Sequence, residues 1–307
     1  MKLQAVPTNP GMEDWIAERA QRVDACLQQM LPVEQVEPAQ LHAAMRWASV
    51  GAGKRVRACM VYAAGSACLA GTADASLQRA LDQAACAVEL VHAYSLIHDD
   101  LPCMDDDSMR RGKPATHVEF GEAMALLAGD AMQPLAFEWL SEMPISPALV
   151  VQSVHTLAYA IGSQGMAGGQ AVDLLSTGQV LDEVSLAQMH AKKTGSLLAA
   201  CAQLGAIIVG AGSAQRESLR SYSRAIGLAF QVVDDVLDVT VGSEQLGKTA
   251  GKDAAAQKAT YVSLMGVDGA TAYARELYQQ ACDAIVIFGR RGDYLRGLAD
   301  FIVQRAY

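Results

Sequence analysis

Two clusters of aspartate residues lie far apart in this chain of 307 residues. The first, DDLPCMDDD, runs from Asp99 to Asp107, and the second, DDVLD, runs from Asp234 to Asp238. Each cluster follows an apolar stretch with helical spacing, where an unpaired carboxylate is costly to bury. Carboxylates in such surroundings pair with cations or bind metal ions. Two clusters that face each other would hold hard divalent ions, and those ions would bind a diphosphate.

The second cluster has the spacing of a metal site on a helix. Asp234 and Asp238 are four residues apart, so on a helix they lie above one another on one face. Like charges at this spacing destabilise a helix unless a cation is bound. Mg²⁺ takes one or two carboxylates and completes its coordination with water and phosphate. The second cluster therefore indicates bound Mg²⁺.

The first cluster has a different geometry. Asp99 and Asp105 are six residues apart, and Pro102 between them lacks a backbone N–H. We therefore expect Asp99 near a helix end and Asp105 on a distorted extension or loop, from which both reach one metal if the backbone bends. A competing interpretation is that this cluster caps a helix and is otherwise solvated. The presence of two such clusters after long apolar helices favours the metal site.

Basic residues next to glycines accompany both clusters. Arginine binds phosphate through a bidentate fork and lysine adds a point charge, so metals and these cations together suit a multiply charged phosphate. A single basic residue is usually a solvated surface charge, but this placement favours a binding role. The residues selected on this basis are Lys54, Arg57, Arg110, Arg111, Lys193 and Lys248.

The segment from Gly242 to Thr249 (GSEQLGKT) matches the phosphate-binding pattern G-x-x-x-x-G-K-[ST]. A P-loop follows a buried parallel strand, whereas this segment follows the second aspartate cluster. Glu244 would also lie in the phosphate cradle, and no alternation of strands and helices surrounds it. A P-loop NTPase is therefore disfavoured.

The composition predicts a large core and excludes several classes of protein. Hydrophobic residues make up 51% of the chain and charged residues 19%, and the formal net charge of −9 argues against a general nucleic-acid binder. Seven cysteines without a Cys-x-x-Cys pair indicate reduced thiols. The N-terminal sequence has no apolar signal-peptide core, and the longest apolar run, 197–212, is too short to span a membrane. We expect a soluble cytoplasmic protein.

Hydrophobic periodicity predicts helices almost throughout. Residues 1–11 read as a loose tail with Pro7, Pro10 and Gly11 as helix breakers. Alternating strand patterns are scarce, so we predict one all-α domain over 1–307, a bundle of about ten or more helices around a central apolar cavity. The predicted helices cover 14–31, 76–98, 120–141, 148–164, 185–210, 214–240 and 270–288.

Several motifs together resemble one known family. The stretch from Leu96 to Pro114 resembles the first aspartate-rich motif of bacterial short-chain trans-prenyl diphosphate synthases, and 230–238 (FQVVDDVLD) resembles their second. The resemblance runs from about residue 40 to the end of the chain. The shorter motifs follow in the family's order: GKRVR at 53–57, GGQ at 168–170, KTG at 193–195, LGK at 246–248 and KATY at 258–261.

The resemblance implies the isoprenoid synthase fold, a homodimer and Mg²⁺, as three ions or with Mn²⁺ in its place. The reaction it implies is condensation of isopentenyl diphosphate with dimethylallyl or geranyl diphosphate. The implied metal ligands are Asp99, Asp105 and Asp234, supported by Asp100 and Asp238, with Asp235 in the same catalytic set. The allylic diphosphate would bind Arg110, Lys193, Thr194, Gln231 and Lys248. Isopentenyl diphosphate would bind Lys54, Arg57, His92 and Arg111, and Lys258 would help close the site.

The chemistry implied by the family needs no separate general base. The allylic C–O bond ionises, cations stabilise the leaving diphosphate, and the carbocation must be kept from water. The double bond of isopentenyl diphosphate attacks, and the released diphosphate takes the proton. The chain departs from the family pattern at Ala52, Ala58 and Ser108, and its C-terminus is only weakly basic. We expect these departures to alter closure of the loops over the site and the affinity for substrate.

The resemblance to the family implies that the residue five positions before Asp99 sets the product length. Tyr94 is bulky and Ser95 is small, and both lie about one helical turn below Asp99, roughly 6–7.5 Å along the axis. This pattern resembles farnesyl diphosphate (C15) synthases, with Tyr94 as the floor of the cavity. Tyr94 as an ordinary core residue, and geranyl or geranylgeranyl diphosphate as product, stay open. A terpene cyclase and a non-catalytic regulatory subunit of a prenyl synthase also compete with this interpretation.

Overall fold

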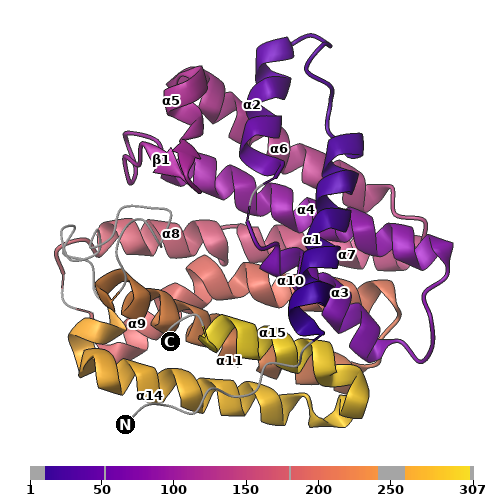
Figure 1. The fold of residues 1–307 in the computed structure, drawn as a ribbon, viewed down its shortest axis with the longest axis vertical. Coiled ribbons are helices and arrows are strands. Elements are labelled where there is room, and N and C mark those ends of the chain that lie inside the picture. The colour runs from indigo at the N-terminus through magenta and orange to yellow at the C-terminus, as the bar shows by residue number, and fades with distance from the viewer. Residues whose placement is uncertain (1–10, 52, 180, 241–259, 305–307) are drawn as a thin grey trace.

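The computed structural model of the chain describes residues 11–51, 53–179, 181–240 and 260–304, and these ranges form a bundle of helices (Figure 1). The first half contains α1 (Met12–Met30), α2 (Ala39–Ser49), α3 (Val56–Cys68), α4 (Ala75–Asp99), α5 (Thr116–Phe120), α6 (Glu122–Ser141) and α7 (Pro147–Ile161). The second half contains α8 (Met166–Leu175), α9 (Glu183–His190), a π-helical turn (Ala191–Gly195), α10 (Ser196–Ile208), α11 (Ser213–Thr240), α14 (Tyr261–Ala284), a 3-10 helix (Val286–Gly292) and α15 (Asp293–Gln304). The all-α prediction is confirmed.

Strand structure in the described residues is confined to one small hairpin. β1 (Met109–Arg110) pairs antiparallel with β2 (Lys113–Pro114), with Arg110 opposite Lys113. Two residues in the left-handed backbone region, Arg111 with φ 53° and Gly112 with φ 76°, close the turn. The hairpin therefore holds Arg110 and Arg111 on a tight turn directly after the first aspartate cluster.

The strongly periodic segments form helices where the sequence predicts them. Predicted segment 185–210 forms α9, the π-helical turn and α10 instead of one continuous helix, and predicted segment 270–288 begins earlier, at Tyr261. Helices α2, α3, α8 and α15 lie outside the predicted segments. α3 is buried from Ala58 to Gly65 without interruption, so its sequence carries little amphipathic contrast.

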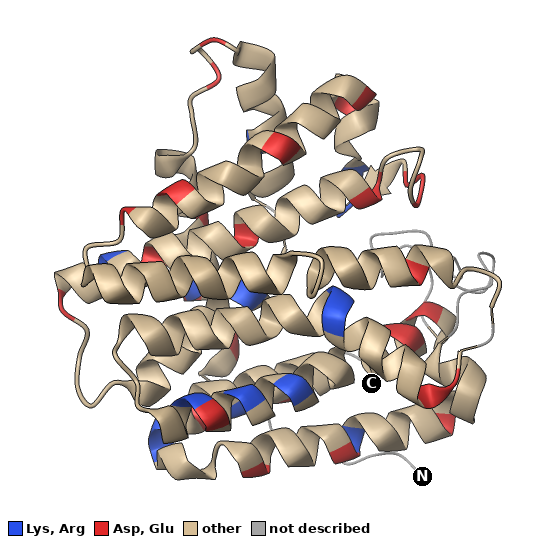
Figure 2. Ribbon diagram, turned by 180° about the vertical axis from the view of Figure 1, so that it is seen from behind, with Lys and Arg blue, Asp and Glu red and all other residues tan. Residues whose placement is uncertain are grey.

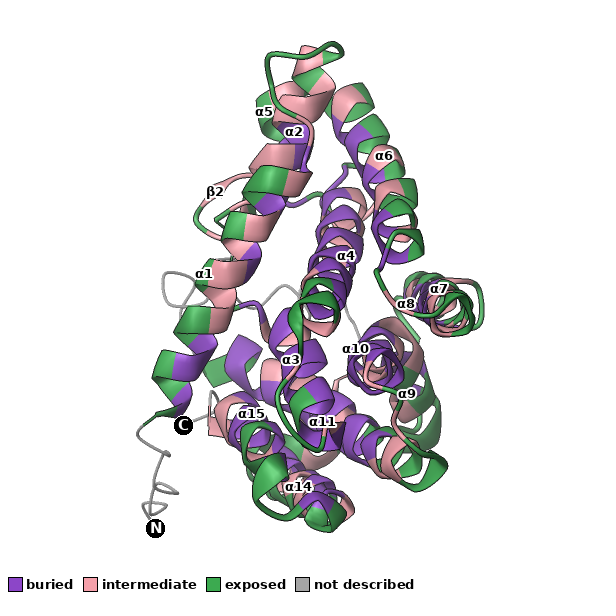
Figure 3. Ribbon diagram, turned by 90° about the vertical axis from the view of Figure 1, so that its right-hand side faces the viewer, coloured by how far each residue is buried: buried purple, intermediate pink, exposed green. Residues whose placement is uncertain are grey.

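The core is centred on α3, α4 and α10, with α11 beside them (Figure 3). α3 and α10 cross with their backbones in contact, because a Cβ atom on Gly205 would lie 2.2 Å from the carbonyl oxygen of Val61. Such a crossing requires glycine at that point. The packed centre fixes the direction of α4, whose last residue is Asp99.

The predicted tail lies outside the described residues, apart from Gly11, which precedes the first turn of α1. Within the described ranges, no helix is both long enough and apolar enough to cross a bilayer.

Candidate active site

The first aspartate cluster bends back on itself where α4 ends. The backbone N–H of Asp105 donates to the carbonyl oxygen of Asp99 at 2.8 Å, and the N–H of Asp107 donates to that of Asp100 at 3.2 Å. Asp106 adopts a left-handed conformation with φ 49°. The expected arrangement of a helix end followed by a loop is confirmed, and it brings Asp105 back beside Asp99.

Asp99 lies in a crowded electrostatic environment. Burial raises its pKa to about 6; the charge of Lys193 opposes the shift, and the carboxylates of Asp105 and Asp100 add to it. A carboxylate that is half-buried among other carboxylates is stabilised by any cation that binds it. The end of α4 therefore favours binding of a positive ion.

Asp100 and Arg110 hold each other in this structure. Arg110 Nε donates to both carboxylate oxygens of Asp100 at 3.1 Å, and its Nη2 pairs with the same group. Asp107 lies 3.8 Å from Arg110 as a second partner. Figure 2 shows acidic and basic parts of the ribbon next to each other in the region where α4 leads into the hairpin. The two residues expected to contact metal and diphosphate separately are thus already paired, which fixes the hairpin against α4.

The second aspartate cluster lies within α11, and two of its side chains have different surroundings. Asp235 is buried, and its Oδ2 accepts from the backbone N–H of Tyr261 at 2.7 Å at the start of α14. Asp238 is also buried, and its Oδ2 has no hydrogen-bond partner among the described residues. Asp235 is thus committed to the α11–α14 contact, whereas Asp238 retains an oxygen that no described residue hydrogen-bonds.

The π-helical turn connects the site across three elements. Lys193 Nζ pairs with Asp173 Oδ2 of α8 at 2.6 Å, and Thr194 Oγ1 donates to Gln231 Oε1 of α11 at 2.6 Å. A Cβ atom on Gly169 of α8 would lie 2.1 Å from the backbone nitrogen of Lys193. π-helical turns inside helices are frequent at functional sites. This one directs Lys193 to Asp173, leaves its charge able to lower the pKa of Asp99, and holds Thr194 against α11 about one turn before the second aspartate cluster.

Two of the cations expected to bind isopentenyl diphosphate, Arg57 and Arg111, act on His92 of α4 together with Arg110. Burial, reinforced by the charges of Arg57, Arg111 and Arg110, holds the pKa of His92 well below its ordinary value. Burial also lowers the pKa of Arg111 to about 10. Arg57 Nε is buried without a hydrogen-bond partner among the described residues. Cationic groups this crowded, beside a neutral imidazole, favour binding of an anion.

The loop that carries Lys54 packs against two other parts of the chain. A Cβ atom on Gly53 would lie 3.2 Å from the guanidinium carbon of Arg111, so this loop approaches the hairpin closely. Lys54 Nζ lies 4.8 Å from the ring centre of Phe301 on α15. The last described helix therefore borders the loop of the predicted phosphate-binding lysine.

The chemistry of these donors fits hard divalent cations. Among the described residues, no group of three or more His, Cys, Asp or Glu side chains is already gathered tightly enough to hold a metal alone. Mg²⁺ commonly binds one or two carboxylates and takes its other ligands from phosphate and water. The raised pKa of Asp99 and the unbonded oxygen of Asp238 are consistent with carboxylates that meet a metal–diphosphate complex.

Sequence reasoning missed residues that the structure places at the site. Asp173 holds Lys193, and Gln170 on the same helix has both amide atoms buried without hydrogen-bond partners among the described residues. The signal was the GGQ motif at 168–170, which continues to Asp173 on one helical face. Glu89 was also missed, although it is a carboxylate in the apolar run before His92. Predicted residues Lys248 and Lys258, and the P-loop-like segment 242–249, lie outside the described residues.

Tyr94 lies between α4 and α6. Its side chain is buried, its hydroxyl accepts from Gln133 Nε2 at 3.3 Å, and its ring meets that of His98 edge-on at 5.8 Å. Ser95 donates from Oγ to the carbonyl oxygen of His92 at 2.9 Å within the helix. About one helical turn below Asp99, the large side chain is therefore that of Tyr94, and the side chain of Ser95 is small.

Comparison with known proteins identifies the family. Over residues 38–285 the chain matches the family model described as polyprenyl synthetase. It is 43% identical to heterodimeric geranylgeranyl pyrophosphate synthase large subunit 1 of Arabidopsis thaliana, over 98% of this chain and 81% of that protein. It is also 43% identical to a probable farnesyl diphosphate synthase of Bradyrhizobium diazoefficiens, over 96% and 87% of the two chains.

Solved structures agree with this assignment. An FPP/GFPP synthase of Zymomonas mobilis matches with a TM-score of 0.85 at 38% identity, over 96% of this chain and 99% of that chain. A geranyltransferase of Legionella pneumophila matches with a TM-score of 0.84 at 34% identity, over 97% and 98%. The isoprenoid synthase fold expected from the sequence is confirmed, and the chain belongs to the polyprenyl synthetase family of prenyltransferases.

Proposed function

We propose that this protein is a Mg²⁺-dependent farnesyl diphosphate synthase. It would condense isopentenyl diphosphate first with dimethylallyl diphosphate and then with geranyl diphosphate. The observation that carries the proposal is the π-helical turn between α8 and α11, where Lys193 pairs with Asp173 of α8 and Thr194 donates to Gln231, three residues before the second aspartate cluster. Carboxylates for metals, cations for phosphate and a second cation group around His92 suit two diphosphate substrates.

The carboxylates would hold three Mg²⁺ ions between the two clusters. Asp99, Asp105 and Asp234 would be ligands, and Asp238 would support them through its unbonded oxygen. Bound Mg²⁺ would supply positive charge to the diphosphate as it leaves. Asp100 is assigned to orienting Arg110, with which it is paired, and Asp235 to anchoring the start of α14.

The cationic residues would act at two stages of the reaction. Lys193, Arg110 and the hydroxyl of Thr194 would bind the allylic diphosphate, and the electron pair of the breaking C–O bond would go to that leaving group. Lys54, Arg57 and Arg111 would hold isopentenyl diphosphate with its double bond toward the allylic carbon, with neutral His92 as a further donor. Attack forms the new C–C bond, and the proton that is lost passes to the released diphosphate.

Product length is proposed to be C15 because Tyr94 occupies the space between α4 and α6. Geranylgeranyl diphosphate is the second candidate, since the Arabidopsis relative is named for that product. A non-catalytic regulatory subunit is disfavoured because both aspartate clusters and their flanking cations are intact in the sequence.

An assay of purified protein tests the activity. With Mg²⁺, isopentenyl diphosphate and dimethylallyl diphosphate, we expect farnesyl diphosphate by mass spectrometry, and chelation of the metal should abolish its formation. Absence of any prenyl product under these conditions would refute the proposal, and a C20 main product would replace C15 with the second candidate.

The chain-length assignment has its own pair of variants. Tyr94→Ala opens the space between α4 and α6, so products longer than C15 should form. Tyr94→Phe keeps the ring and loses only the hydrogen bond to Gln133, so C15 should persist. An unchanged product from Tyr94→Ala would remove Tyr94 as the floor of the cavity.

A further inference from the structure

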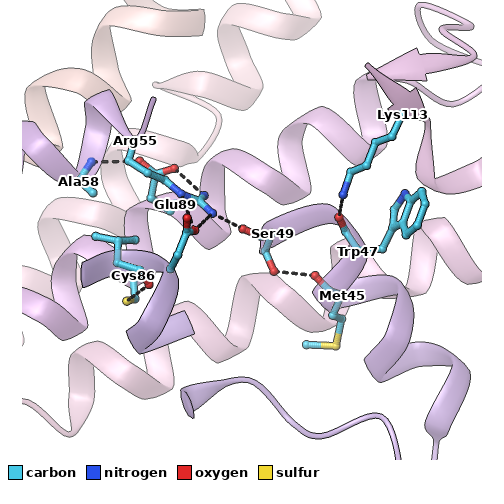
Figure 4. A network of polar contacts seen from close by, with 10 residues as sticks. Met45, Trp47, Ser49, Arg55, Ala58, Cys86, Glu89 and Lys113 are labelled. Atoms are coloured by element: carbon cyan, nitrogen blue, oxygen red, sulfur yellow. Dashed lines mark hydrogen bonds and ion pairs between the residues drawn. The ribbon is translucent and has the colours of Figure 1, made fainter. Parts of the chain in front are cut away.

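A buried ion network joins α1, α3 and α4 outside the set of residues expected to touch substrate (Figure 4). Its centre is Arg55, which is 3% exposed and adopts a left-handed conformation with φ 52°. Arg55 Nη2 pairs with Asp24 Oδ1 of α1 at 2.5 Å, and Nη1 pairs with Glu89 Oε2 of α4 at 3.2 Å. A third contact runs from Nη2 to the carbonyl oxygen of Ser49.

Glu89 also controls the start of α3. It is 3% exposed, and its Oε1 accepts from the backbone N–H of Ala58 at 3.0 Å. Ala58 is the third residue of α3, where a backbone N–H has no partner within the helix. In this chain Glu89 therefore binds Arg55 through one oxygen and the helix start through the other.

The network is close in sequence to three of the residues proposed to bind isopentenyl diphosphate. Lys54 and Arg57 flank Arg55 in sequence, and His92 follows Glu89 by three residues on α4, about one turn later. Glu89 is also the strongest attraction that opposes the lowering of the pKa values of Arg57 and Arg111 by burial. One carboxylate thus supports the backbone of the loop and offsets the charge of two arginines.

We propose that Asp24, Arg55 and Glu89 are positioning residues for the isopentenyl diphosphate site, which they arrange before that substrate binds. The inference rests on the function proposed above. A left-handed conformation at a residue other than glycine is unfavourable, so it persists only where the surroundings fix it. The network provides that constraint. It fixes the backbone at Arg55, and Lys54 and Arg57 lie on either side of Arg55 in the sequence.

The competing explanation is an ion network that contributes only to the stability of the fold. The chain offers a matched control, because Asp82 of α4 also pairs with α1. Its two oxygens accept from Arg22 Nε and Nη2 at 2.7 Å, and Tyr62 donates to it at 2.8 Å. These partners lie on α1 and in the middle of α3, so Asp82 joins the same helices at a distance from the loop that precedes α3.

The test compares Glu89→Gln and Asp24→Asn with Asp82→Asn, each of which removes one charge without a large change in shape. We expect Glu89→Gln to raise the KM for isopentenyl diphosphate about 10–100-fold, the range found when residues that orient metal ligands through hydrogen bonds are removed. The KM for dimethylallyl diphosphate should change much less, because Glu89 hydrogen-bonds to none of the described residues proposed to bind that substrate. Asp24→Asn should act in the same direction more weakly, because Asp24 is the more exposed partner. Asp82→Asn should lower the thermal midpoint and leave both KM values near those of the unaltered protein.

Calorimetric titration with isopentenyl diphosphate separates this inference from the proposed function, because binding does not require turnover. Weaker binding by Glu89→Gln than by Asp82→Asn, at equal folded content by circular dichroism, supports positioning. Equal binding by the two variants would overturn it, even if the enzyme makes farnesyl diphosphate. If Glu89→Gln does not fold, Asp24→Asn decides by the same comparison. If the unaltered protein binds isopentenyl diphosphate but forms no prenyl product, the proposed synthase function is refuted. The comparison of binding by the variants would still test the positioning role.

Discussion

Asp99 illustrates that the chemical role of a residue is easier to predict from the sequence than the side chains that it contacts. Aspartates in apolar helical surroundings predict a cation-binding site, and the structure places Asp99, Asp105 and Lys193 close enough to alter the pKa of Asp99. The pairings Arg110 with Asp100 and Lys193 with Asp173 were not predicted, because they depend on which side chains the fold brings together. The kind of chemistry that a residue can perform is therefore predictable from the sequence, whereas its hydrogen-bond partners are not.

Loss of the metal-binding carboxylates is the first residue-scale prediction. Asp99→Ala and Asp234→Ala should each reduce kcat at least ~100-fold, because charge on the leaving diphosphate loses its stabilisation. The thermal midpoint of Asp99→Ala should not fall, since burial of the Asp99 carboxylate is itself unfavourable. Steady-state kinetics and thermal melts measure the two quantities, and near-normal turnover would contradict the metal role.

At the scale of elements, the ends of helices are easier to predict from the sequence than their interruptions. Pro102 and the six-residue spacing place the end of α4 near Asp99, and the helix does end there. The π-helical turn at Ala191–Gly195 was not predicted, because an inserted residue hardly changes the periodicity of a buried helix. Helix α8, with its short glycine-rich sequence, lacks the length that a periodic pattern needs.

Contact between α8 and the π-helical turn leads to the second prediction. Gly169→Ala would place a Cβ atom 2.1 Å from the backbone nitrogen of Lys193, so one element must move. Overpacking of this kind costs about 1–3 kcal/mol, and the shift should also displace Lys193 from its partner on α8. We expect a lower thermal midpoint and a higher KM for the allylic diphosphate.

Gly212→Ala is the control for this substitution. A Cβ atom on Gly212 meets no atom within 4 Å, and Gly212 precedes α11 away from the turn. It should leave both the melt and the KM values near those of the unaltered protein. A Gly169→Ala variant that behaves like Gly212→Ala would show that the close approach does not constrain the site.

On the scale of the whole molecule, apolar side chains remain exposed on neighbouring helices. Val118 of α5 is 52% exposed, and Leu126 and Leu127 of α6 are 47% and 52% exposed. α5 leads directly into α6, and α6 lies at the edge of the bundle beside α4 (Figure 3). A group of exposed apolar residues on packed helices is typical of a protein–protein interface.

A homodimer through this face is the third prediction. The unaltered protein should give twice the mass of one chain by light scattering, because a second copy covers the same surface in a two-fold interface. Leu127→Glu places a charge in that interface and should shift the protein toward monomer. Val286→Glu makes the same kind of change at a 65% exposed valine on the 3-10 helix, outside the α5–α6 face, and should stay dimeric. A monomer from the unaltered chain would exclude the dimer, and a dimeric Leu127→Glu would move the interface elsewhere.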